Sequence, residues 1–221
     1  MIDCSRKKVI HESHVLEGMS LLLSLFPGLA DHDGEFVPFW PRDSEPWSVL
    51  IGNDGGLISQ ISELAEDEKR IIIHPSAKIG DNVCIEGPCF IGKDVEIRHS
   101  AYLRKGSWIC EGGMVGHSTE VKNSLFLPGA KAPHFNYVGD SILGFSVNIG
   151  AGVKLSNVRN DRGLIRAPME DGSFLETGLR KFGALVGDGS QIGCNSVSNP
   201  GSIIPPGSMV NPNETITGWL N

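Results

Sequence analysis

An aliphatic residue stands at every sixth position of the chain between residues 73 and 127. Neither a helix, with its period of about 3.6 residues, nor a strand, with a period of about 2, requires this spacing. A six-residue repeat is typical of a parallel β-helix, in which three short faces close a triangular coil of about 18 residues. A chance period in an ordinary β-sandwich is the alternative, and ten aliphatic residues in ten positions argue against it. The positions are Ile73, Ile79, Ile85, Ile91, Ile97, Leu103, Ile109, Val115, Val121 and Leu127.

A second series consists of small or β-branched residues, each two positions before a residue of the aliphatic series. We expect the aliphatic series to point into the prism and the smaller series to line its inner wall near the corners. Pairs such as Ile79-Gly80, Ile91-Gly92 and Val115-Gly116 are expected to form corners, because glycine accepts positive φ without strain. The second series is Ala77, Val83, Cys89, Val95, Ala101, Ser107, Gly113 and Thr119.

Bulk composition excludes several classes of partner. The 221 residues carry a net charge of −7, which argues against nucleic acid or an anionic membrane as the main partner. The five cysteines are scattered, without a CxxC pair or a disulfide framework, and predict reduced thiols in a cytoplasmic protein. The longest apolar run, Met19 to Phe26, is too short to span a bilayer.

The repeat divides the chain into two parts, 1–70 and 71–221. The first lacks the repeat and is expected to be a partly helical cap or interface arm, with a helix between His14 and Phe26 and one or two more between Trp47 and Glu66. Within the second part, we expect a loop at Pro128–Asn136 to leave the prism and a longer insertion at Ser156–Lys181. The repeat resumes after each, with Ser198 as its one polar member.

The two interruptions carry the candidate chemistry, because departures from a regular coil are where functional residues usually lie. His134 stands beside Pro133 and Phe135 in the first, and a neutral imidazole there can accept a proton from an attacking amine. The alternative is a loop histidine with a structural hydrogen bond. Arg104 and Lys122 are separated by three repeats, the length of one coil, so they are expected to stack on adjacent coils and to bind an anion together.

The segment His134-Phe135-Asn136-Tyr137-Val138-Gly139-Asp140, followed by Asn148-Ile149-Gly150-Ala151-Gly152, resembles the acetyltransferase half of bifunctional N-acetylglucosamine-1-phosphate uridyltransferase. The chain is even more similar to sugar-1-phosphate nucleotidyltransferases with a C-terminal acetyltransferase domain, which share blocks like Gly129–His134, Asn157–Arg159 and Gly178–Lys181. The likeness covers roughly residues 71–215. It implies an all-β, left-handed parallel β-helix, normally a homotrimer with sites between subunits, that transfers acetyl from acetyl-CoA to an amino-sugar phosphate.

The resemblance also implies a role for each matching residue. His134 corresponds to the general base, and the backbone N–H of Ala151 to the donor that faces the thioester carbonyl. The positions that would bind the sugar phosphate are Arg104, Lys122, Tyr137, Asn148 and Lys181, and those that would bind acetyl-CoA are Asn157 and Cys194. No metal is expected. Four other cations are more weakly placed as candidates for this site: Lys154, Arg159, Arg162 and Arg166.

Three departures from the family pattern bear on the substrate. The short stretch 1–70 stands where larger members carry a nucleotidyltransferase domain, so uridyl transfer is not expected. Val158 replaces a tyrosine that is usual in glucosamine-1-phosphate acetyltransferases, and the 156–181 insertion is longer than in the bifunctional enzyme. The last two leave the identity of the amino sugar open, and Val158 also bears on the mode of CoA binding.

Two other functions fit a β-helix. His99 and His117 are also separated by the length of one coil and could stack, as metal-binding histidines do in γ-class carbonic anhydrases, but the HxxxxH spacing is absent at 117. The other alternative is a catalytically silent trimeric scaffold or regulatory partner of a sugar nucleotidyltransferase. Retention of Arg104, Lys122, His134, Tyr137 and Asn148 argues against that alternative.

Overall fold

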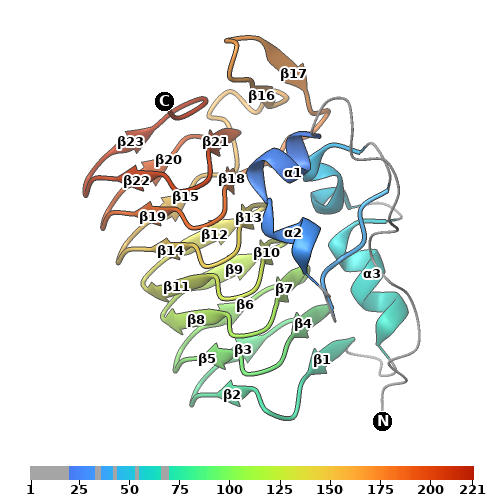
Figure 1. Cartoon of the computed structure of the whole chain (residues 1–221). Coiled ribbons are helices and arrows are strands. Elements are labelled where there is room, and N and C mark those ends of the chain that lie inside the picture. Colours follow the sequence, from blue (N-terminus) through green and yellow to red (C-terminus); the bar gives the residue numbers. More distant parts are fainter. Residues whose placement is uncertain (1–19, 33–35, 42–43, 53–54, 66–69) are drawn as a thin grey trace.

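The computed structural model describes residues 20–32, 36–41, 44–52, 55–65 and 70–221. Within them the chain forms three parallel seven-stranded sheets that stack coil upon coil from β1 to β23 (Figure 1). The predicted fold class, a left-handed parallel β-helix, is confirmed. We name the sheets A, B and C in the order in which each coil visits them.

The strands are short because each forms one face of a coil. Sheet A contains β1 (Ile71–Ile73), β4 (Cys89–Ile91), β7 (Ser107–Ile109), β10 (Leu125–Phe126), β13 (Ile142–Leu143), β18 (Ala184–Val186) and β21 (Ser202–Ile204). Sheet B contains β2 (Lys78–Ile79), β5 (Glu96–Ile97), β8 (Met114–His117), β11 (Lys131–His134), β14 (Asn148–Ile149), β19 (Gln191–Ile192) and β22 (Met209–Val210). Sheet C contains β3 (Cys84–Ile85), β6 (Tyr102–Leu103), β9 (Glu120–Lys122), β12 (Tyr137–Gly139), β15 (Lys154–Leu155), β20 (Val197–Ser198) and β23 (Thr215–Ile216).

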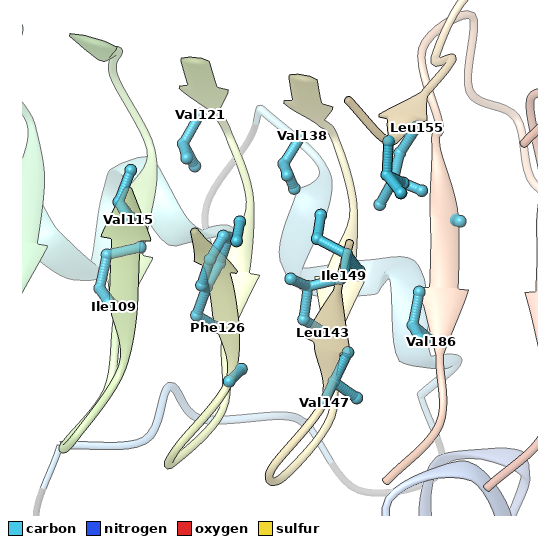
Figure 2. Packing of buried hydrophobic residues seen from close by; sticks show 14 of the residues in the cluster. Ile109, Val115, Val121, Phe126, Val138, Leu143, Val147, Ile149, Leu155 and Val186 are labelled. Carbon is cyan, nitrogen blue, oxygen red and sulfur yellow. The ribbon is translucent and has the colours of Figure 1, made fainter. Parts of the chain in front are cut away.

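The aliphatic series fills the interior of the prism, as predicted. Ile109, Val115 and Val121 come from the three sheets of one coil, and their side chains converge in Figure 2. Removing such side chains from water is the main favourable contribution to folding. Ile73 and Ile79 of the first coil remain 43% and 40% exposed, so the described residues leave that end of the interior open.

Two corners are one residue shorter than the repeat predicts. Phe126, not Leu127, is in register with Ile109, and Leu143 is in register with Phe126, so each of these two coils falls one residue short of three full repeats. The prediction for Leu127 was therefore wrong: it packs in a second core outside sheet A. Both shortened corners lie between sheets C and A.

The loop predicted at Pro128–Asn136 was also wrong. Residues 131–134 form β11, which pairs with β8 in register Ala132 to Val115, and Ala132 is fully buried in the prism. The preceding corner is one residue short, so the inward-facing positions of this coil fall one residue earlier than a strict period of six predicts. The segment therefore continues the prism, and only the numbering of the repeat changes.

The corner glycines act differently from the prediction. Gly80, Gly92 and Gly116 are not among the residues with positive φ. A Cβ on Gly116 would overlap the backbone of Pro133 in the next coil. Glycine is required at this position because successive coils approach closely, not because the corner needs a left-handed conformation.

The helices of the N-terminal part lie beside sheet A (Figure 1). They are α1 (Leu21–Leu25), α2 (Gly28–Asp31), the 3₁₀ helix η1 (Pro46–Leu50) and α3 (Leu57–Leu64). The helix predicted from His14 ends before Pro27, as expected, and its first half lies outside the described residues. Phe26, Trp47 and Leu57 are buried in the same hydrophobic cluster as Phe90 and Trp108 of sheet A, so this second core joins the N-terminal part to the prism.

The predicted insertion at Ser156–Lys181 leaves the prism at the corner between sheets C and A. It contains an antiparallel hairpin of β16 (Arg166–Pro168) and β17 (Phe174–Glu176). The prism resumes without a change of register, because Leu143 pairs with Val186 across the insertion. In the described part of the chain, we find no helix whose length and apolar character would let it cross a bilayer.

Candidate active site

His134, Ala151 and Cys194 occupy the same position of three successive coils. The register that pairs Lys131 with Asn148 and Asn148 with Gln191 brings them together three residues further along. Two hydrogen bonds confirm this alignment: Gly152 N–H donates to the His134 carbonyl at 2.9 Å, and Asn195 N–H donates to the Ala151 carbonyl at 2.8 Å. The side chains of His134 and Cys194 are exposed.

The backbone around His134 is fixed by one buried amide. Asn136, which is 3% exposed, accepts a hydrogen bond from His134 N–H at 3.0 Å and donates to the Gly150 carbonyl at 2.7 Å. Phe135 between them has a φ of 52°, a left-handed conformation that bulky residues rarely adopt. Asn136 therefore holds a strained turn from which the imidazole projects into solvent.

The His134 ring and Ala151 N–H form no hydrogen bond with the residues that the structure describes. Such an imidazole is free to accept a proton, and such an N–H can meet a developing oxyanion. Among the described residues, none forms the structural hydrogen bond to the ring that the alternative for His134 requires.

A second cluster forms at the corner between sheets C and A. Lys122, at the end of β9, donates to both oxygens of Asp140 at 3.1 and 3.0 Å. The side chains of the pair are only 13% and 5% exposed, respectively. Asn157 donates to the same carboxylate and accepts a hydrogen bond from the Tyr137 hydroxyl at 3.4 Å. Three predicted site residues, Lys122, Tyr137 and Asn157, thus meet around an acid.

Arg104 lies next to this cluster with an acid of its own. Its guanidinium donates to Glu120 at 2.9 Å, and Glu120 is in register with Tyr137. Burial raises the pKa of Tyr137 above its ordinary value, and the carboxylates of Glu120 and Asp140 raise it further. The Tyr137 hydroxyl consequently stays protonated and can donate a hydrogen bond at neutral pH.

The predicted site residues fall into two groups at opposite edges of sheet C. His134, Ala151 and Cys194 lie at its edge with sheet B, and Asn148 lies in β14 of sheet B. Lys122 and Asn157 lie at its edge with sheet A, and Lys181 is exposed just before Phe182, whose N–H donates to the Asn157 carbonyl. The imidazole of His134 and the ammonium of Lys122 therefore lie at different edges of sheet C within one chain.

Three of the more weakly placed cations have contacts of their own, and one of them, Lys154, is in register with Tyr137. Arg159 pairs with Asp161, Arg166 stacks over Phe174 with 4.8 Å to the ring centroid, and Lys154 donates to the Gly152 carbonyl at 2.6 Å. His99 and His117 do stack, at 4.1 Å between centroids. Within the described ranges, no group of three or more histidine, cysteine or acidic side chains is arranged to hold a metal.

Asp140 is the residue of this site that sequence reasoning missed. It was part of the family motif but carried no assigned role. The spacing of three repeats was no guide to it, because this coil is one residue short and Lys122 is in register with Gly139. Asn123, which donates to Asp140 at 2.9 Å, was also missed because it lies at a corner where the repeat had lost a residue.

Several curated proteins are similar to the chain. Over 185 residues it is 32% identical to a bifunctional sugar-1-phosphate nucleotidylyltransferase/acetyltransferase of Sulfurisphaera tokodaii, covering 76% of this chain and 43% of the relative. Over 188 residues it is 33% identical to the bifunctional protein GlmU of Methanococcus maripaludis, covering 77% and 43%, respectively. The chain thus spans less than half the length of these relatives. The family resemblance inferred from the sequence is confirmed.

Comparison with family profiles and solved structures adds little. No known family profile matches the chain. The acetyltransferase domain of PglB from Neisseria gonorrhoeae FA1090 is 17% identical, with a TM-score of 0.35, and the match covers 67% of this chain and 50% of that one. A hexapeptide transferase family protein from Anaplasma phagocytophilum is 20% identical, with a TM-score of 0.34 and coverage of 67% and 74%, respectively. TM-scores this low support no conclusion about function.

Proposed function

From the homology of this chain to the bifunctional sugar-1-phosphate nucleotidylyltransferase/acetyltransferases, we infer that it is an N-acetyltransferase. Its proposed acetyl donor is acetyl-CoA, and its proposed acceptor is an amino-sugar phosphate such as glucosamine-1-phosphate. We expect no nucleotidyltransferase activity from these residues. We further propose that the protein acts in the cytoplasm in nucleotide-sugar biosynthesis.

The alignment of His134, Ala151 and Cys194 on three successive coils is the observation that carries the proposal. It places the imidazole of His134 one coil away from the backbone N–H of Ala151. An acetyl transfer to an amine needs a base to take the proton from nitrogen and a donor to stabilise the oxyanion. His134 and Ala151 N–H, which the fold holds in register, are the groups that we propose for these two roles.

The proposed reaction begins when the neutral amine attacks the thioester carbonyl, forming a C–N bond. His134 accepts a proton from the nitrogen while Ala151 N–H donates to the oxyanion. The C–S bond then breaks, and the thiolate of CoA leaves and takes up a proton. These steps need no metal, and holding the two substrates together supplies much of the acceleration.

The second cluster is the proposed site for the sugar phosphate. Arg104, Lys122 and Lys181 are proposed to bind the phosphate, and Tyr137 and Asn148 the sugar ring. Asn157 and Cys194 are the proposed contacts of acetyl-CoA. Because the two groups stand at opposite edges of sheet C, we propose that a homotrimer completes each site, with one subunit supplying the base and its neighbour the phosphate cations. Light scattering tests this, since a monomer at working concentration would contradict it.

An acceptor panel tests the activity. Release of the CoA thiol is measured with glucosamine-1-phosphate and galactosamine-1-phosphate, with the unphosphorylated amino sugars as controls. We expect release with at least one phosphate and a much weaker response to the controls, because the cations recognise phosphate. Silence across the panel would instead favour a trimeric scaffold or regulatory partner of a nucleotidyltransferase.

A further inference from the structure

One carboxylate organises the corner between sheets C and A. Asp140 accepts two hydrogen bonds at each oxygen: from Lys122 and Asn123 at Oδ1, and from Lys122 and Asn157 at Oδ2. A carboxylate offers about four acceptor sites, so Asp140 is saturated by residues of its own chain. It has no remaining capacity to contact a ligand directly.

The pairing fixes the position of the Lys122 ammonium. Its nitrogen lies 3.1 and 3.0 Å from the two oxygens of Asp140. An ammonium has three N–H groups, so donors remain for a ligand. Lysine otherwise has a flexible stem, and this contact fixes where its charge lies.

Asp140 also sets the position of Tyr137 through an amide. Asn157 gives its NH₂ group to Asp140, which orients its carbonyl oxygen toward the Tyr137 hydroxyl. A change at Asp140 would free the Asn157 amide to rotate. Two groups proposed to contact the substrate therefore depend on one residue that does not.

We propose that Asp140 is a positioning residue of the amino-sugar phosphate site, which aims Lys122 directly and Tyr137 through Asn157. This inference rests on the proposed function for its substrate. Asn123 extends the network, because its NH₂ group also donates to the Leu50 carbonyl of η1 at 2.9 Å. The N-terminal part of the chain is thereby connected to the same carboxylate.

Steady-state kinetics of Asp140→Asn is the first test. We expect the KM for the amino-sugar phosphate to rise about 10-fold or more, as loss of a charge-assisted hydrogen bond does, and the KM for acetyl-CoA to rise less, because Asp140 holds only Asn157 of its two proposed contacts. Glu111→Gln is the matched control, because Glu111 also pairs with a lysine of the preceding coil but on an exposed surface. An unchanged KM for the sugar phosphate in Asp140→Asn would overturn the proposal.

A double variant separates positioning from folding. Asp140→Asn alone leaves Lys122 without its counter-ion, which can destabilise the fold. Asp140→Asn with Lys122→Met removes both charges of the pair. If Asp140 acts through Lys122 and Tyr137, then in a Tyr137→Phe background, which removes the second route, the double variant has the same KM for the sugar phosphate as Lys122→Met. A further large rise in the double variant would contradict that coupling.

Tyrosine titration provides a readout that needs no activity. The chain contains two tyrosines, so in a Tyr102→Phe background the ultraviolet signal of ionisation reports Tyr137 alone. We expect Asp140→Asn to lower the pKa of Tyr137, because a nearby negative charge is lost, and Glu111→Gln to leave it unchanged. If the wild type releases no thiol, the proposed function fails, while an unchanged Tyr137 pKa shows that Asp140 does not hold Tyr137.

Discussion

Sheets A and C receive strands from the same coils, yet their outer faces differ in chemistry. Sheet A presents Phe90, Trp108 and Leu125, which are buried beneath the N-terminal helices. Sheet C presents Tyr102, Glu120, Tyr137 and Lys154 in register, and these side chains stay at least partly accessible. The repeat constrains the inside of the prism alone and leaves each outer face to its own role. The outer face of sheet A forms a second core with the N-terminal helices. The outer face of sheet C is accessible to a ligand or another subunit.

The largest effect on activity is expected beside sheet C. His134→Ala removes the proposed base, and we expect kcat to fall about 10²- to 10⁴-fold. The midpoint of thermal unfolding should not change, because the ring is exposed. His99→Ala is the matched control, since His99 is exposed and lies in line with His134 two coils earlier. Undiminished turnover in His134→Ala would remove His134 from the mechanism.

The largest effect on stability is expected at sheet A. Trp108 is 2% exposed, stacks on Phe90 at 4.7 Å and donates to the Phe36 carbonyl at 2.8 Å. We expect Trp108→Ala to lower the free energy of unfolding by about 3–5 kcal/mol, because truncating a buried aromatic leaves a cavity. Urea unfolding would measure it against Tyr102→Ala on sheet C. Equal losses in the two variants would mean that the two faces do not differ as described.

Asn123 tests the link between the two faces, because its NH₂ group contacts both Leu50 of η1 and Asp140. We expect Asn123→Ala to cost about 1–3 kcal/mol, since it leaves buried acceptors without a donor. Asn123 has a φ of 44°, so the substitution also adds backbone strain. Asn195→Ala, at an exposed corner with a φ of 60°, measures that strain separately. If both variants lose the same stability, the hydrogen bonds of Asn123 contribute nothing.

The period of six was enough to predict the prism, its interior and the place of the long insertion. It failed at Leu127 and at Pro128–Asn136, because two corners between sheets C and A each lack one residue. Asn123 and Asp140 stand at those corners with positive φ. A frame shift is invisible to a search for a constant period, and so is the polar cluster that fills the shortened corners.

The site was predicted unevenly for the same reason. Spacing alone paired Arg104 with Lys122, since both precede the first short corner, and the family motif supplied His134 and Ala151. Neither the spacing nor the motif could show that Arg104 forms an ion pair with Glu120 and Lys122 with Asp140, because these contacts depend on the directions of the side chains. The described N-terminal helices had no repeat at all, and their packing follows from the aromatic residues of sheet A.

The smallest effect tests the interior common to both faces. Ser198, the polar member of the aliphatic series, is fully buried, and its hydroxyl has no partner among the described residues. We expect Ser198→Ala to raise the free energy of unfolding by about 1 kcal/mol, because a buried hydroxyl without a hydrogen bond opposes folding. Ser202→Ala should lower it by about 1 kcal/mol, since that equally buried hydroxyl donates to the Asn199 carbonyl at 2.7 Å. Opposite signs would show that a buried hydroxyl of the prism stabilises the fold only where a backbone carbonyl accepts its proton. A loss in both variants would mean that Ser198 has found a partner such as water.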